Sequence, residues 1–145
     1  MPHADHEVLI QRSPADVFDF LANGLNNPLW RTGVSHVRLA SGTAGVVGAV
    51  YSQKMAGPGG RTIDGDYRIT ESEPGVRLRF EVVAGPARPT GSFTLSGHDA
   101  GTSVAFSLDL EPKGLMKLMG PMITKTMKSE VAQLDNLKRV LEEGR

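Results

Sequence analysis

Hydrophobic and polar positions follow two different periods along the chain. They alternate between residues 34 and 110, and after Pro112 they recur at helical spacing. Alternation is typical of a strand with one buried face, and a period near 3.6 is typical of an amphipathic helix. The sequence therefore predicts an antiparallel sheet with one wet face, followed by a long helix.

Six segments alternate in the first region, and residues 7–12 predict a further short strand before them. The positions expected to face inward are Val37 and Leu39; Tyr51, Gln53 and Met55; Ile63, Tyr67 and Ile69; Leu78, Phe80 and Val82; Phe93 and Leu95; and Val104, Phe106, Leu108 and Leu110. Glycine and proline residues between the segments are typical of turns. Seven strands are expected in all.

Two short helices are expected between the first strand and the rest of the sheet. Ser13 is a good cap, Pro14 suits the first helical position, and Asp16 favours the positive end of a helix. Val17, Phe18 and Leu21 form the apolar stripe of this helix, which should end near residues 23–24. A second, very short helix is expected to begin at Pro28.

The long helix is expected over about residues 121–142, with Gly120 and Pro121 interrupting the turns before it. One apolar face collects Leu115, Leu118, Met119, Met122, Ile123, Met127, Val131, Leu134, Leu137 and Leu141. A sheet and a helix with one apolar face each bury those faces against one another. The sequence thus predicts a single α+β domain over residues 1–145.

Composition removes several classes of function. Sixteen basic and sixteen acidic residues give a net charge of zero, whereas a nucleic-acid-binding surface normally leaves a basic excess. The absence of cysteine excludes disulfides, thiol nucleophiles and zinc–thiolate sites. No signal peptide is apparent, and no apolar run approaches the roughly 20 residues of a membrane span. We expect a soluble, cytoplasmic protein with no stable membrane insertion.

Two groups of residues are candidates for the lining of a pocket. The first is the methionines of the C-terminal helix with Met55, because methionine adapts to varied apolar guests; ordinary core packing is the alternative. The second is Tyr51, Gln53 and Tyr67, which share an inward phase near Trp30. A buried Gln53 needs a partner, which a ligand, a water molecule or neighbouring backbone would supply.

Other polar residues predict little chemistry. Asp64 and Asp66 share a strand phase but should face water, because their neighbours take the apolar face. His3 and His6 flank Asp5 near the start of the chain without further ligands, so no metal site is expected. The lysines of the C-terminal helix are diluted by acidic residues and predict a solvated face.

The order of elements resembles the START-like superfamily, also called Bet v1-like or SRPBCC. Four segments also resemble its polyketide cyclase/dehydrase and lipid transport branch: SPADVFDFLAN, NNPLWRTGV, GPGGRTIDGDYRITE and GPMITKTMKSEVAQLDNLKRVLE. The resemblance covers residues 6–142 and implies a helix-grip fold, in which a curved seven-stranded antiparallel sheet wraps around a long C-terminal helix. It also implies a cavity between sheet and helix for a lipid- or polyketide-like molecule.

The leading hypothesis is therefore the binding of a hydrophobic small molecule, without a cofactor or a metal. The residues expected to line the site are Trp30, Tyr51, Gln53, Met55, Tyr67, Phe80, Phe93, Phe106, Met119, Met122, Ile123 and Met127. One alternative is an aromatase/cyclase or dehydratase, in which Tyr51, Gln53, Tyr67 and Arg31 are the residues to test. A protein-interaction domain is another alternative. Catalysis, ligand identity and oligomeric state are left open.

Overall fold

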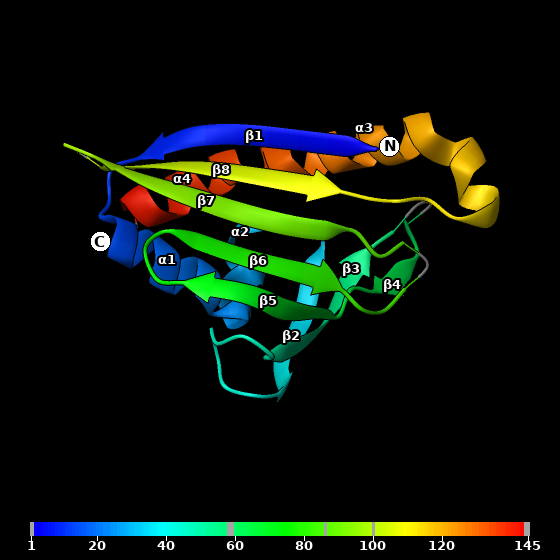
Figure 1. Cartoon of the computed structure of the whole chain (residues 1–145), viewed down its shortest axis with the longest axis horizontal. Coiled ribbons are helices and arrows are strands. Elements are labelled where there is room, and N and C mark those ends of the chain that lie inside the picture. Colours follow the sequence, from blue (N-terminus) through cyan, green and yellow to red (C-terminus); the bar gives the residue numbers. More distant parts are fainter. Residues whose placement is uncertain (1, 58–59, 86, 100, 144–145) are drawn as a thin grey trace.

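The computed structural model describes residues 2–57, 60–85, 87–99 and 101–143. Within these residues the chain forms one antiparallel sheet of eight strands, with helices α2, α3 and α4 behind it in the view of Figure 1. The strands are β1 (His3–Ile10), β2 (Val34–Ser41), β3 (Val50–Ala56), β4 (Thr62–Asp64), β5 (Tyr67–Glu73), β6 (Arg77–Val82), β7 (Thr90–His98) and β8 (Gly101–Asp109). The helices are α1 (Pro14–Ala22), α2 (Asn27–Trp30), α3 (Gly120–Ala132) and α4 (Leu134–Glu143), with short 3₁₀ helices η1 (Gly24–Asn26) and η3 (Gly114–Met119).

The sheet has the order β1-β8-β7-β6-β5-β3-β2, and β4 pairs with β3. Strands β5 to β8 follow one another as hairpins, which is the simplest way to build an antiparallel sheet. Strand β1 pairs with β8 along its whole length, from His3 opposite Asp109 to Ile10 opposite Thr102. The first strand of the chain therefore lies beside the last one, where α3 and α4 cross the sheet (Figure 1).

Helix α1 begins as the sequence predicts. The Ser13 hydroxyl accepts a hydrogen bond from the backbone N–H of Asp16 at 3.2 Å, and Pro14 is the first helical residue. Val17, Phe18 and Leu21 are buried against the sheet. Capping and burial thus act together to hold this nine-residue helix, which is too short to be stable alone.

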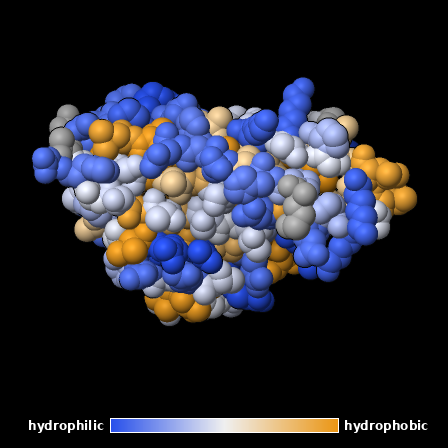
Figure 2. Space-filling view, turned by 45° about the horizontal axis from the view of Figure 1, so that its top comes forward, coloured by the Kyte–Doolittle hydropathy of each residue, from blue (hydrophilic) through white to orange (hydrophobic). Residues whose placement is uncertain are grey.

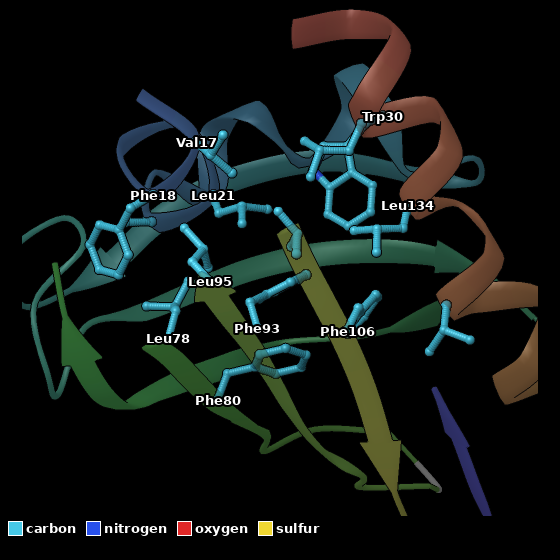
Figure 3. Packing of buried hydrophobic residues seen from close by; sticks show 14 of the residues in the cluster. Val17, Phe18, Leu21, Trp30, Leu78, Phe80, Phe93, Leu95, Phe106 and Leu134 are labelled. Carbon is cyan, nitrogen blue, oxygen red and sulfur yellow. The ribbon is translucent and has the colours of Figure 1, made fainter. Parts of the chain in front are cut away.

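The core is built around aromatic rings. Trp30 of α2 meets Phe93 and Phe106 edge-on, with ring centroids 6.0 and 6.1 Å apart, and those two phenylalanines stack at 4.3 Å. Figure 3 shows the Trp30 indole between Leu21 on one side and Leu134 of α4 on the other. Trp30 therefore links the short helices, the sheet and the C-terminal helix in one cluster.

The α+β arrangement of an antiparallel sheet with a long C-terminal helical region is confirmed, with three local differences. The expected strand over residues 63–69 is divided into β4 and β5, because Gly65 donates its N–H to the Gln53 carbonyl and leaves the regular ladder. The first strand begins at His3, earlier than expected. The long helix is interrupted at Gln133, whose N–H bonds to the Glu130 carbonyl in a tighter turn.

A further expectation is wrong. Met127, Val131, Leu134, Leu137 and Leu141 are buried, as predicted. Most earlier members of the same helical face are exposed, up to 83% for Leu115 and Leu118, while Ile123 is half-buried against the core. The pattern identified a common face correctly, but the sheet covers only the C-terminal part of it.

Candidate functional site

One enclosed cavity lies inside the described part of the fold. Its volume is about 20 Å³, and its lining comes from α1, α2 and the facing strands β5, β6 and β7. The lining residues are Leu21, Ala22, Asn27, Trp30, Arg31, Tyr67, Ile69, Leu78, Phe80 and Phe93. This volume accommodates about one water molecule, far below the 300–1,000 Å³ typical of small-molecule sites. The core is nearly filled in this conformation.

Polar side chains meet on one side of this cavity and form what we call the polar corner: Asn27, Arg31, Gln53 and Tyr67. The buried Asn27 amide donates to Gln53 Oε1 at 3.1 Å and to the Tyr67 hydroxyl at 2.9 Å. Helix α2 supplies Asn27, while β3 and β5, which pair at Tyr51 and Tyr67, supply the acceptors. Gln53 thus has a partner in a side-chain amide, which was not among the partners that the sequence suggested.

The two tyrosines stack, with centroids 5.4 Å apart, and both are buried. Burial raises the pKa of Tyr67 to about 12, and the hydrogen bond from Asn27 offsets this rise only in part. The Tyr67 hydroxyl therefore keeps its proton at neutral pH. Because its oxygen already accepts from Asn27, its O–H is left to donate.

Arg31 is the one charged member of the polar corner. It is 8% exposed and donates from Nη2 to Glu130 Oε2 of α3 at 2.7 Å. Its guanidinium carbon lies 5.8 Å from the Trp30 ring centroid and 5.9 Å from that of Phe106. These contacts let a buried cation persist, because its charge is balanced and its flat faces pack on aromatic rings. They also tie the end of α2 to α3.

Two residues that line the cavity each have a buried donor without a hydrogen-bond partner among the described residues: Trp30 Nε1 and Arg31 Nε. Trp30 is only 3% exposed, so water outside the protein does not reach it. Figure 3 shows its indole nitrogen on the edge that faces Leu21, another residue of the cavity lining. Buried donors without partners are uncommon in folded proteins, because each loses the hydrogen bond that it made to water.

The predicted site residues fall into four groups. Trp30, Tyr67, Phe80 and Phe93 line the cavity. Tyr51, Gln53, Phe106 and Met127 are buried without lining it, while Met55 and Ile123 are half-buried. Met119 and Met122 are 44% and 57% exposed. The structure therefore brings the aromatic and amide residues together, but it does not bring the first helix methionines to them.

The location of the cavity also differs from the expectation. The hollow was expected between the sheet and the C-terminal helix, yet no residue of α3 or α4 is in the lining of the enclosed cavity. Asn27 was missed as a site residue, and Arg31 was considered only for the enzymatic alternative. An asparagine before Pro28 reads as an ordinary turn residue, and only its long-range partners reveal a different role.

A larger hollow of about 850 Å³ lies on the surface where β8 leads into η3 and α3. Its lining includes Pro2, Pro112, Lys117, Pro121, Lys125 and Lys128. In Figure 2 a hydrophobic patch beside hydrophilic side chains occupies this end of the molecule, where Leu115 and Leu118 are exposed. This groove is open and contains no buried polar group, so it offers less chemistry than the polar corner.

Two other features are absent from the described residues: a cluster of metal ligands and a membrane-spanning helix. No group of three or more histidine and carboxylate side chains is placed to hold a metal ion. His3 instead bonds to Asp109 at 2.6 Å and to Asp5 at 2.8 Å, and these hydrogen bonds raise its pKa. No described helix is long and apolar enough to cross a membrane.

The curved antiparallel sheet, the short helices after β1 and the C-terminal helix across β1 and β8 define a helix-grip protein. The chain belongs to the polyketide cyclase/dehydrase and lipid transport family of the SRPBCC superfamily, whose model matches residues 1–142. The resemblance stated from the sequence is thus confirmed. No functionally curated protein matches the sequence significantly.

Solved structures with the same fold are only distantly related in sequence. TTHA0849 from Thermus thermophilus is 16% identical with a TM-score of 0.82, and the match covers 99% of each chain. CV1439 from Chromobacterium violaceum is 16% identical with a TM-score of 0.73, covering 98% of this chain and 99% of that one. The di-domain ARO/CYC StfQ from the steffimycin biosynthetic pathway is 13% identical with a TM-score of 0.76, covering 99% of this chain and 51% of that one. At these identities the likeness establishes the fold alone.

Proposed function

We propose that this protein binds one hydrophobic small molecule, lipid- or polyketide-like, in its interior beside the polar corner. The observation that carries the proposal is the pair of buried, partnerless donors, Trp30 Nε1 and Arg31 Nε, at a cavity with otherwise largely apolar walls. Such sites are mostly apolar with a few convergent polar groups that orient the ligand. The description of the family as cyclase/dehydrase and lipid transport agrees with a ligand of this kind.

The cavity must enlarge before it holds such a ligand. About 20 Å³ admits one small group, so the sheet and the helices have to separate locally. The most easily displaced helical segment is η3 with the first turns of α3, which lie outside the cavity lining; none of its side chains before Met127 is fully buried, and Met116 and Ile123 pack only partly against the core. Segments with few buried apolar contacts open at the lowest free-energy cost. The Arg31–Glu130 ion pair couples this movement to the polar corner.

Trp30 provides a direct test, because it is the only tryptophan and lines the cavity. Binding of medium- and long-chain apolar compounds should change its fluorescence saturably at one ligand per chain, and should raise the melting temperature. At a ligand concentration of 100 times Kd, the expected stabilisation is about 2.7 kcal/mol.

A matched surface variant separates interior binding from adsorption. Leu118→Ser removes apolar surface from η3 and leaves the cavity lining unchanged. We expect this variant to bind like the wild type. Binding that disappears in Leu118→Ser, or the failure of every apolar compound to shift both signals, would contradict an interior site.

An enzymatic role in aromatase/cyclase or dehydratase chemistry is the second candidate. It is favoured by Tyr67, whose hydroxyl stays protonated at neutral pH and lines the cavity, so it could donate a proton to a reacting oxygen. Turnover that is lost in Tyr67→Phe while ligand affinity is retained would support this role. Equal turnover in the wild type and Tyr67→Phe would exclude Tyr67 as the proton donor.

A further inference from the structure

Trp30 and Arg31, which line the cavity, each have one partnerless polar atom, and both atoms are donors, which restricts what the site can recognise. The indole Nε1 and the guanidinium Nε carry hydrogens and no lone pair available to accept, so each acts only as a donor. Both are buried without a partner among the described residues. The Tyr67 hydroxyl accepts from Asn27 and has its own hydrogen left to donate. The group that satisfies these donors must therefore be an acceptor.

The charge balance at Arg31 further restricts which chemical groups can be the acceptor. Arg31 is already paired with Glu130 at 2.7 Å, so the positive charge is balanced before a ligand arrives. A carboxylate placed there would leave one buried negative charge in excess, which is costly in an apolar interior. A neutral carbonyl oxygen accepts hydrogen bonds without adding a charge.

Resting on the proposed function, we infer that the ligand carries a neutral carbonyl group, as in a ketone or an ester, whose oxygen accepts hydrogen bonds from Trp30, Arg31 and Tyr67. The existing cavity of about 20 Å³ is large enough for such an oxygen but not for a chain. The carbonyl therefore occupies the cavity, and the apolar remainder of the ligand occupies the space that opens when the sheet and the helices separate beside it.

Three ligands of equal chain length test this inference: a methyl ketone, the alkene in which CH₂ replaces the carbonyl oxygen, and the carboxylate. Trp30 fluorescence gives each dissociation constant. The ketone should bind more tightly than the alkene by about 2- to 12-fold for each hydrogen bond formed, and also more tightly than the carboxylate.

Two conservative tyrosine variants keep the Trp30 signal and form a matched pair. Tyr67→Phe removes a donor of the cavity and should reduce the ketone-over-alkene preference by about 2- to 12-fold. Tyr51→Phe removes a hydroxyl that bonds elsewhere, to the Gly45 N–H and the Ala22 carbonyl, and should leave the preference unchanged. In Trp30→Phe the ketone should raise the melting temperature less than in the wild type, while the effect of the alkene is retained.

The outcomes separate this inference from the function on which it rests. Equal affinity for ketone and alkene would overturn carbonyl recognition while leaving apolar binding intact. Tighter binding of the carboxylate than of the ketone would overturn the inference that the acceptor is neutral. An equal loss of preference in Tyr51→Phe and Tyr67→Phe would overturn the assigned donors. If none of the three ligands binds, the proposed function and the carbonyl site are refuted together.

Discussion

Replacing Gly24 by alanine should disturb the polar corner through steric overlap alone. Gly24 is buried in η1 and has no positive φ, so the backbone itself accepts an alanine. An added Cβ, however, would overlap the Tyr67 hydroxyl oxygen and lie 2.7 Å from Tyr51 Cδ1. Since the two rings stack on each other, neither moves aside independently.

The expected cost follows from this geometry. Overpacking a filled core costs about 1–3 kcal/mol, and the lower entropy of an unfolded alanine chain returns about 0.4–1 kcal/mol. Taken at the middle of both ranges, Gly24→Ala should therefore lose about 1–2 kcal/mol of unfolding free energy. For a chain of this length the melting temperature should fall by about 2–8 °C. Urea denaturation and calorimetry measure the two quantities.

Two further variants show whether the stated contact is responsible. Gly120→Ala places a Cβ where no atom lies within 4 Å, so it should leave stability unchanged or slightly raise it. Combining Gly24→Ala with Tyr67→Phe removes the oxygen that the new methyl overlaps, and the cost of Gly24→Ala should shrink by about 1 kcal/mol. The reasoning fails if Gly24→Ala is as stable as the wild type, or if its cost is the same with and without the Tyr67 hydroxyl.

Three other predictions concern stability. The pKa of Tyr67 is raised from 10.0 to about 12, so the unfolded chain loses this proton at a lower pH than the folded protein does. The protonated hydroxyl therefore contributes fully to the unfolding free energy below pH 10, and about 2–3 kcal/mol of that free energy is lost between pH 10 and 12. Urea titrations at several pH values measure this loss, with Tyr67→Phe as the variant that should not show it. Glu130→Ala leaves the buried Arg31 without its partner and should lower the unfolding free energy by about 1–3 kcal/mol. Glu81→Ala breaks an exposed ion pair with Arg68 and should lower it by at most about 1 kcal/mol. Similar losses in the two variants would contradict this difference. Leu118→Ala should change the unfolding free energy by less than about 0.5 kcal/mol, while Leu137→Ala should cost about 2–5 kcal/mol, and a large loss in the former would mean that η3 is packed in solution.

The sequence determined the local elements of this protein and most of their buried faces. The Ser13 cap, the alternating phenylalanines of β6 to β8 and the apolar stripe from Met127 onward all appear where the pattern placed them. These features depend on neighbours within one or two turns or on the alternation of a strand, so short stretches of sequence contain the information.

Only the tertiary structure decided which residues form the site. Asn27 meets Gln53 and Tyr67 across 26 and 40 residues of chain, and Arg31 meets Glu130 across 99. Such contacts depend on strand order, on register and on how the four-residue helix α2 packs on the sheet. The local pattern of hydrophobic and polar residues contains no information about them. They explain why the aromatic residues of the site and Gln53 were predicted, whereas Asn27 was not.

The same limit applies to the C-terminal helix and to the cavity. An apolar stripe tells which side chains share a face, but coverage of that face depends on how far the sheet extends beneath it, so Met122 is exposed while Met127 is buried. Cavity volume is a small difference between the space enclosed by the fold and the side chains that fill it. Sequence alone therefore predicted a helix-grip domain, and three-dimensional packing brought the polar corner together beside a cavity of about 20 Å³.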